Sequence, residues 1–196
     1  MAPLITFDEA MALGELTDHD DIGALVERAW EVRTENFGDS TDMCSLVNAK
    51  SGGCAEDCGF CAQSRYAEAD TPMHAMMEPE QILEHAEAAE AAGAHRFCMV
   101  TQGQGLSKRD FAKILEGARL VAENTNLKRC ASVGHISPDR AHKLAEAGIQ
   151  RVHHNVETSR SYYDEVTTTG HERQGRTRKS GNSLPGEKTR MLGRRR

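Results

Sequence analysis

Three cysteines within eight residues are the part of this sequence best suited to chemistry. Cys54, Cys58 and Cys61 form a C-x3-C-x2-C pattern inside the glycine-rich stretch 51–64, which reads SGGCAEDCGFCAQS. Glycine adopts backbone angles that other residues resist, so we expect this stretch to be a loop. A structural zinc site takes four protein ligands, whereas a four-iron cluster held by three cysteines keeps one iron open. An open iron can bind a cofactor or substrate directly, so the triplet predicts a catalytic iron–sulfur centre.

Other uses of these cysteines stay open at this point. Cys44 can supply a fourth ligand, which closes an all-cysteine zinc or electron-transfer site. The thiols can also remain unligated, because free cysteine is often buried as a small apolar residue. Disulfides are the least favoured use, since the sequence shows no secretory segment and its six cysteines fit a reducing compartment.

The residues around the triplet resemble a known family. The stretch NAKSGGCAEDCGFCAQS, residues 48–64, is similar to the cluster-binding loop of the biotin synthase family, a branch of the radical S-adenosylmethionine (SAM) enzymes. The triplet alone identifies only the wider superfamily, while NAKSG before it and AQS after it narrow the resemblance to this branch. With the further matches described below, the resemblance covers roughly residues 5–169.

The resemblance implies a definite set of cofactors and partners. Cys54, Cys58 and Cys61 would hold a [4Fe-4S] cluster whose open iron chelates S-adenosylmethionine, with Phe60 beside the adenine or simply packed in the loop. One electron from a donor such as flavodoxin or ferredoxin would release a 5′-deoxyadenosyl radical that removes hydrogen from dethiobiotin. The resemblance also implies a homodimer at full length. Because the cofactors carry this chemistry, no acid–base catalytic residue is predicted.

Two further cysteines, Cys98 and Cys130, lie within predicted strands. Without the family, each is best interpreted as a small buried apolar residue. The segments FCMV around Cys98 and RCASVG around Cys130 resemble those that bind a second, [2Fe-2S] cluster in the family. That cluster is the family's proposed sulfur donor, so the pair favours sulfur insertion into dethiobiotin over other radical reactions.

The segment 152–159, VHHNVETS, resembles the family's substrate-contacting strand. Asn155 matches an asparagine that contacts the ureido ring of dethiobiotin, and an amide can both donate to and accept from a cyclic urea. His154 and Glu157 match positions that line the same cavity. His153 stands where the family usually has asparagine, so this sequence departs from the family there.

The elements that position these residues alternate along the chain. Each predicted strand is followed by a helix, which indicates parallel βαβ units. The predicted strands cover residues 43–49, 95–100, 127–133 and 150–156, and the predicted helices cover residues 78–92, 107–124, 137–148 and 158–166. One or two helices precede them over residues 8–36, with a cap at Thr17 and Asp18. Such α/β units fit an open sheet or half of a (β/α)8 barrel, and the resemblance favours a partial TIM-type barrel.

Composition divides the 196 residues into a helical lead-in over residues 1–40, a partial radical SAM barrel over 41–169 and a tail over 170–196. Residues 171–196 carry nine Lys and Arg against two Glu, and they show no helical or strand period, so the tail is predicted to be disordered. The abrupt change indicates a reading-frame change or a truncated gene, with RNA binding by the basic tail as a less favoured alternative. An unclosed barrel is then expected, with Cys98, Cys130 and Asn155 open to water.

Residues 1–170 carry a net charge of −13, which argues against nucleic acid as a partner. No apolar run approaches the length of a membrane span, so a cytoplasmic protein is expected. Three functions fit these observations: a biotin synthase by descent, another radical SAM enzyme on the same scaffold, and a non-catalytic iron–sulfur-binding remnant. The pair formed by Cys98 and Cys130 favours the first.

Overall fold

The structure is a computed structural model that describes residues 5–159 and 161–169, so the tail predicted over residues 170–196 lies outside the described residues. The chain divides into two compact units between Asp42 and Met43, and each unit is described by itself. Among the helices of the described residues, none has the length and apolar character needed to cross a membrane.

The first unit contains two helices, α1 (Phe7–Gly14) and α2 (His19–Phe37). Asp18 begins α2, and its carboxylate accepts hydrogen bonds from the backbone N–H groups of Asp20 and Asp21. These bonds satisfy two of the donors left unpaired at a helix N-terminus, so the cap predicted from the sequence at this break is confirmed. No described residue of either helix is buried.

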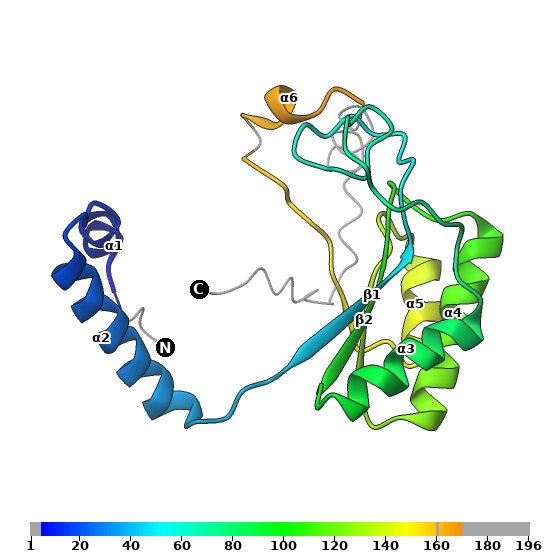
Figure 1. Cartoon of the computed structure of the whole chain (residues 1–196), viewed down its shortest axis with the longest axis horizontal. Helices are drawn as coiled ribbons and strands as arrows, with labels where there is room; N and C mark the ends of the chain where they lie inside the picture. Colours follow the sequence, from blue (N-terminus) through cyan, green and yellow to red (C-terminus); the bar gives the residue numbers. More distant parts are fainter. Residues whose placement is uncertain (1–4, 160, 170–196) are drawn as a thin grey trace. The chain divides into compact units, whose positions relative to one another are not determined.

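A four-stranded parallel sheet forms the centre of the second unit, and its strand order β1-β2-β3-β4 follows the chain. The strands are β1 (Cys44–Lys50), β2 (Arg96–Thr101), β3 (Lys128–Ser132) and β4 (Arg151–Val152). The helices are α3 (Pro79–Ala91), α4 (Lys108–Asn124), α5 (Pro138–Glu146) and the short α6 (Tyr163–Val166). Figure 1 shows α3, α4 and α5 on the same side of the sheet.

This arrangement decides between the two architectures that the sequence left open. A doubly wound open sheet carries helices on both faces and reverses its strand order, whereas the wall of a (β/α)8 barrel keeps sequential strands with helices outside. Sequential order with one helix-covered face is what the second unit has. The described residues therefore form four strands of a TIM-type barrel wall, as predicted.

Short polar residues begin the helices of this layer. The Ser107 hydroxyl accepts from Asp110 N at the start of α4, and the Ser137 hydroxyl accepts from Arg140 N at the start of α5. Pro79 occupies the first turn of α3, where its missing N–H is no loss. Each start agrees with the sequence prediction, and each places a loop at the C-terminal end of the preceding strand.

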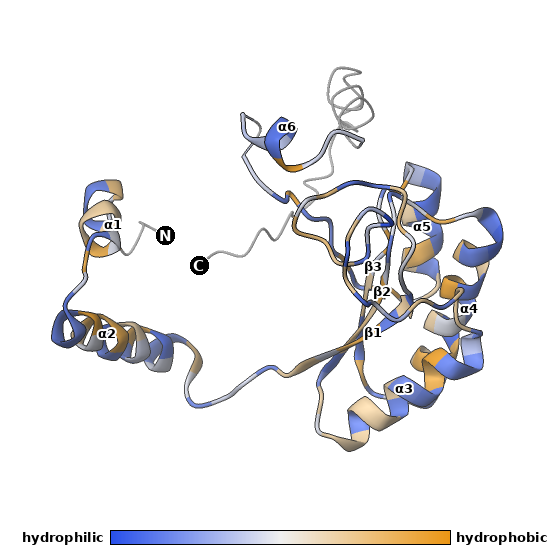
Figure 2. Ribbon diagram, turned by 45° about the horizontal axis from the view of Figure 1, so that its top comes forward, coloured by the Kyte–Doolittle hydropathy of each residue, from blue (hydrophilic) through white to orange (hydrophobic). Residues whose placement is uncertain are grey.

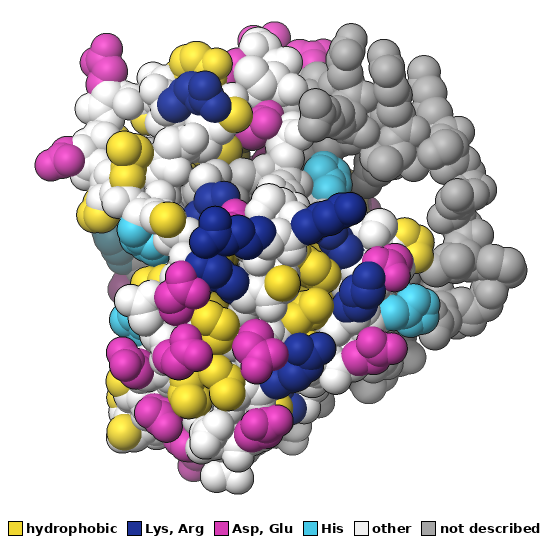
Figure 3. Space-filling model, turned by 90° about the vertical axis from the view of Figure 1, so that its right-hand side faces the viewer, with side chains coloured by type: hydrophobic (Ala, Val, Ile, Leu, Met, Phe, Trp, Pro, Cys, Tyr) yellow, Lys and Arg dark blue, Asp and Glu magenta, His cyan; other side chains and the backbone are white. Residues whose placement is uncertain are grey.

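The core of the second unit lies between the sheet and the helices, and Figure 2 shows the apolar residues of α3 and α4 turned toward the strands. Side chains that fill this layer include Val47, Ala49, Ile82, Phe97, Met99, Ile114, Val121 and Ala131. On the outer face of the helices, Lys and Arg side chains lie among Asp and Glu side chains (Figure 3). Exposed charge pairs add little stability, so the apolar layer holds the unit together.

Two predicted elements are shorter than the sequence indicated. The strand expected over residues 150–156 is only Arg151–Val152, and the helix expected over residues 158–166 is only Tyr163–Val166. Within the described residues, β4 pairs with β3 alone, through Cys130 with Arg151 and Ala131 with Val152. Residues 153–155 are His, His and Asn, which are less suited to a strand than the apolar residues on either side of them, so the pairing of β4 stops at Val152.

Candidate cofactor site

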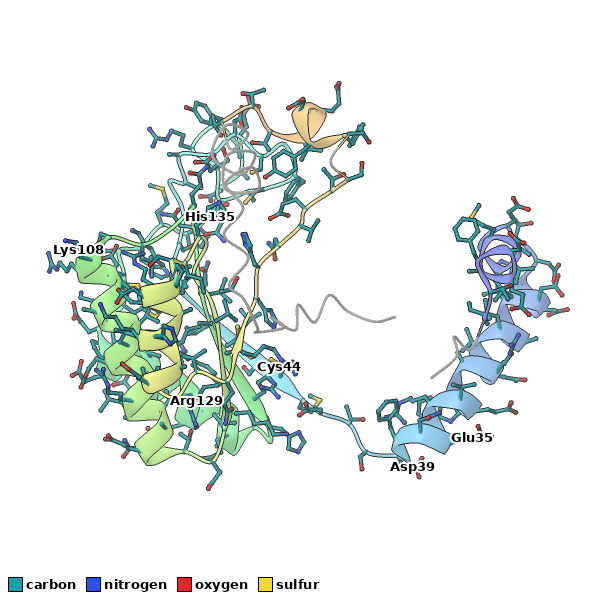
Figure 4. All side chains as sticks on the ribbon, turned by 180° about the vertical axis from the view of Figure 1, so that it is seen from behind. Glu35, Asp39, Cys44, Lys108, Arg129 and His135 are labelled. Carbon is teal, nitrogen blue, oxygen red and sulfur yellow. The ribbon has the colours of Figure 1, made fainter. Side chains whose placement is uncertain are left out.

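The ends of β1, β2 and β3 and the loops that follow them line an open cavity of about 690 Å³. Lys50 comes from the end of β1, Gly53 and Glu56 come from the loop after it, and the other two loops contribute residues 102–105 and 135–137. Figure 4 shows His135 at this end of the sheet and Cys44 at the opposite end. The cavity thus lies at the C-terminal ends of parallel strands, where barrel enzymes bind their ligands.

A close backbone contact shapes the floor of this cavity. Gly105 and Gly134 form an antiparallel bridge, and His135 N donates to the Gln104 carbonyl oxygen at 2.7 Å. Gly134 has φ +69°, and a Cβ built on it would lie 2.4 Å from that same oxygen. Only glycine fits here, because both the backbone angle and the neighbouring backbone exclude a side chain.

Gly134→Ala is expected to lower the free energy of unfolding by at least about 3 kcal/mol, since backbone strain and a backbone clash add. Gly93→Ala is the matched control, because Gly93 has φ +86° but nothing within 4 Å of its built Cβ. The control should lose only about 1 kcal/mol from the backbone angle. Urea denaturation followed by circular dichroism measures both, and equal losses would contradict the close contact.

The cysteine loop is held by its own backbone hydrogen bonds. Cys54 N donates to the Gln63 carbonyl, and Arg65 N donates back to the Cys54 carbonyl, both at 2.9 Å. Cys61 N donates to the Cys58 carbonyl at 3.0 Å. Cys54 is buried, whereas Cys58 and Cys61 are partly exposed. The triplet therefore sits on a locally closed loop, as predicted, with two of its thiols accessible.

The three thiols are close enough to influence one another. Burial is the main cause that raises the pKa of Cys58, whereas Thr167 lowers it. The charges of Cys61, Glu157 and Cys54 raise the pKa further. In residues 5–159 and 161–169, no three His, Cys, Asp or Glu side chains converge on a point that would hold one metal ion. Cysteine thiolates are soft ligands of the kind that iron–sulfur clusters take, so the chemistry of this donor set fits such a cluster.

Cys98 and Cys130 are register partners on β2 and β3, and both are buried, with 3% and 0% exposure. Arg96 Nη1 lies 3.7 Å from Cys130 Sγ. The hydrogen bond from the Cys98 thiol is the main cause that lowers the pKa of Cys130; burial acts against it, and Arg96 and His153 lower the pKa further. The same hydrogen bond and burial raise the pKa of Cys98. The expectation that these two thiols are open to water is therefore wrong, because each covers the other and Arg96 lies against them.

The predicted substrate residues lie on the exposed segment after β4. The ring of His154 meets the ring of His135 edge to face at 5.1 Å, so it stands beside the cavity. Burial, and then His154, lower the pKa of His135. Asn155 is exposed. Phe60, predicted beside an adenine, is 60% exposed and does not line the cavity.

The same segment connects the two groups of cysteines. At its start, His153 lies near enough to Cys130 to affect its pKa, and at its end Glu157 does the same to Cys58. Glu157 has φ +62°, the one positive φ of a non-glycine residue in the described parts of the chain. Such strain persists only where surrounding structure imposes it, and it is often found at functional sites.

Sequence reasoning missed some residues that the structure brings to this site. His135 lines the cavity, and Lys50, which also lines it, forms an ion pair of 2.8 Å with Asp110 of α4. Arg96 lies against the buried cysteine pair. The glycines of the QGQG stretch after β2 were the available signal for a cavity loop, but no pattern linked them to His135.

Comparisons with known proteins agree with this geometry. The family model described as "Radical SAM superfamily" matches residues 49–178. Curated biotin synthases from Pelotomaculum thermopropionicum and Trichodesmium erythraeum are 46% and 42% identical to this chain over 165 and 168 residues. These alignments cover 84% and 83% of this chain but 51% and 45% of the relatives, so the chain spans about half the length of the curated relatives it matches.

A solved structure with a similar fold is the FeFe-hydrogenase maturase HydG from Carboxydothermus hydrogenoformans. The TM-score is 0.66 at 16% sequence identity, and the match covers 81% of this chain and 36% of that one. At this identity the likeness concerns the fold alone.

Proposed function

The chain belongs to the radical SAM superfamily, and from this premise we propose that it is the cluster-bearing part of a biotin synthase. Membership implies a [4Fe-4S] cluster and S-adenosylmethionine as cofactors. The finer proposal is that the site inserts sulfur into dethiobiotin to form biotin. Identity of 40–46% with curated biotin synthases supports it.

In this proposal Cys54, Cys58 and Cys61 hold the four-iron cluster. The loop offers three thiolates, the soft ligands that iron–sulfur clusters take, and two of them are accessible from outside. When bound, the cluster and S-adenosylmethionine supply one-electron chemistry that removes hydrogen from unactivated carbon. The protein contributes binding, orientation and the exclusion of water.

We place S-adenosylmethionine in the cavity beside the cluster loop, because its lining combines polar and charged groups with apolar side chains such as Ile136. Ser137 lines the cavity and also begins α5, so the positive end of that helix faces the space. A helix N-terminus favours a carboxylate, which S-adenosylmethionine carries. Glu56 supplies a negative charge on the wall from the cluster loop, suited to the ammonium and sulfonium groups.

The observation that carries the biotin synthase proposal is the course of the segment after β4. It leaves the sheet next to Arg151, the register partner of Cys130, with His153 N bonded to the Ala131 carbonyl, and it continues to Glu157, whose charge influences the Cys58 thiol. In this proposal a substrate held along the segment lies between the two cysteine groups. Asn155, in its middle, is exposed and able to bind a cyclic urea. His154 and Glu157 complete the proposed substrate contacts.

We further propose that Cys98 and Cys130 are two ligands of the [2Fe-2S] cluster that donates sulfur. Their register pairing and burial away from water support this, and Arg96 adds positive charge beside the thiols. Two cysteines are half of the four ligands that such a cluster usually takes. An external one-electron donor such as flavodoxin or ferredoxin is also required.

The proposed function predicts that the 196-residue chain, reconstituted anaerobically with iron and sulfide, cleaves S-adenosylmethionine under reducing conditions. Chromatography should detect 5′-deoxyadenosine and methionine in equal amounts, and both should be absent when the reductant is omitted. The physical reason is that the cluster loop closes on itself and does not need a complete barrel. A reconstituted chain that holds iron and sulfide but yields no 5′-deoxyadenosine would instead support a non-catalytic remnant.

A further inference from the structure

Asp57, between the first two cysteines of the loop, collects hydrogen bonds from three consecutive threonines, residues 167–169. Its Oδ1 accepts from the Thr167 hydroxyl at 2.7 Å, from Thr168 N at 2.9 Å and from Thr169 N at 3.0 Å. Its Oδ2 accepts from the Thr168 hydroxyl. These bonds, above all the one from the Thr168 hydroxyl, hold the pKa of Asp57 well below its usual range, so the carboxylate is charged when it accepts them.

Backbone groups strengthen the same contact. Asp57 N donates to the Thr169 hydroxyl at 3.0 Å, and Gly59 N donates to the Val166 carbonyl at 2.8 Å. The Thr169 hydroxyl also lies 2.7 Å from Glu56 Oε2. Bonds on both sides of Cys58 thus join the cysteine loop to residues 166–169, which are more than a hundred positions away in the chain.

Thr167 extends this contact to a cysteine of the triplet. It is buried, with 3% exposure, although it follows a four-residue helix on the surface. Its hydroxyl donates to Asp57, and Thr167 lies close enough to Cys58 to lower the pKa of that thiol. A buried residue bonded to Asp57 thus packs beside the neighbouring cysteine of the loop.

We propose that Asp57 is a positioning residue that fixes the cysteine loop against residues 167–169 and so sets where the cluster stands relative to the segment after β4. This inference rests on the proposed function, because it takes the triplet as the cluster ligands. Residues 167–169 follow the segment after β4 by way of α6, so anchoring them restricts where the proposed substrate contacts can lie. Asp57 does not touch the reacting atoms and acts through the loop.

The physical argument is one of preorganisation. The cysteine loop contains three glycines at positions 52, 53 and 59, so its own backbone is permissive. Bonds within the loop close it locally, and among the described residues only 166–169 form hydrogen bonds that join its middle to another part of the fold. Groups that orient metal ligands from outside typically change metal affinity or activity by about 10–100-fold when they are removed.

The test compares iron loss from the reconstituted full chain and its variants after addition of an excess of an iron chelator. Asp57→Ala should lose iron at least about tenfold faster than the unsubstituted chain. Asp57→Asn keeps an accepting oxygen, and its amide can donate to the Thr168 hydroxyl, so we expect iron loss within about threefold of normal. Asp70→Ala, which removes an exposed carboxylate further along the same chain segment, should leave the rate unchanged.

Thr168→Val is a second variant that distinguishes loss of the contact from misfolding of Asp57→Ala, because it removes one hydroxyl and keeps the side-chain shape. It should speed iron loss on its own, and it should add little once Asp57 is already alanine, since both changes break the same contact. Electron paramagnetic resonance of the reduced cluster gives a second readout. The spectral change produced by S-adenosylmethionine should become broader and more heterogeneous in Asp57→Ala.

Hydrogen exchange by mass spectrometry separates this inference from the proposed function. In the chain without metal, Asp57→Ala should exchange faster in peptides covering residues 57–60 and 165–169, whereas Asp70→Ala should not. If the unsubstituted chain binds no cluster, the proposed function fails while the exchange result still decides whether Asp57 fixes the loop. Equal exchange in Asp57→Ala and the unsubstituted chain, or equal iron loss from a cluster-loaded pair, overturns the inference.

Discussion

Cys58→Ala is expected to abolish the brown iron–sulfur chromophore, whereas Cys44→Ala is expected to leave it unchanged. Cys58 lies on the closed loop with Cys54 and Cys61, and a cluster with two protein ligands is poorly held. Cys44 begins β1, and the other six residues of that strand separate it from the start of that loop. At the usual rise this is about 20 Å, too far for Cys44 to reach the same cluster.

Absorbance, iron and sulfide should be measured after anaerobic reconstitution of each purified chain. Iron in Cys58→Ala is expected to fall to the background of the unreconstituted protein, with Cys44→Ala at the level of the unsubstituted chain. Circular dichroism shows whether the variants keep their secondary structure. Loss of the cluster in Cys44→Ala would contradict the proposal that three cysteines hold the cluster and leave one iron open. It would favour a site with four cysteines.

Local physics explains which parts of the fold the sequence could predict. The helix starts at Ser107 and Ser137 follow from side chains that satisfy the first N–H groups of a helix. The end of α3 follows from Gly93, whose φ of +86° suits glycine. The cysteine loop was predictable for the same reason, since its glycines and its spacing are contiguous in the sequence.

The parts that could not be predicted depend on contacts between distant residues. Nothing near Asp57 in the sequence points to Thr168, and nothing near Cys130 indicates that Arg96 lies against it. The length of β4 depends on a neighbouring strand, so the apolar pattern of residues 150–156 overestimated it. The positive φ of Glu157 is likewise imposed by its surroundings rather than by its own preference.

Biotin formation is the reaction expected to be lost entirely when the 196-residue chain is tested by itself. Sulfur insertion needs the substrate held between two clusters in a site that excludes water. In the described residues the sheet has four strands, and on the face away from the helices Leu46 is 64% exposed. Asn155 is exposed too, so water competes for the hydrogen bonds that a cyclic urea would make.

The buried cysteine pair makes this prediction more specific. Cys98 and Cys130 are protected from water, so a two-iron cluster would be lost for want of ligands rather than through exposure of these thiols. The chain alone should therefore cleave S-adenosylmethionine at a cluster held by the closed cysteine loop and release 5′-deoxyadenosine. It should yield no biotin from dethiobiotin. Mass spectrometry of the reaction checks this, with a purified full-length biotin synthase as the positive control. Stoichiometric biotin from the 196-residue chain would contradict this prediction. It would mean that the four strands of the described residues and the thiols of Cys98 and Cys130 are sufficient for sulfur insertion.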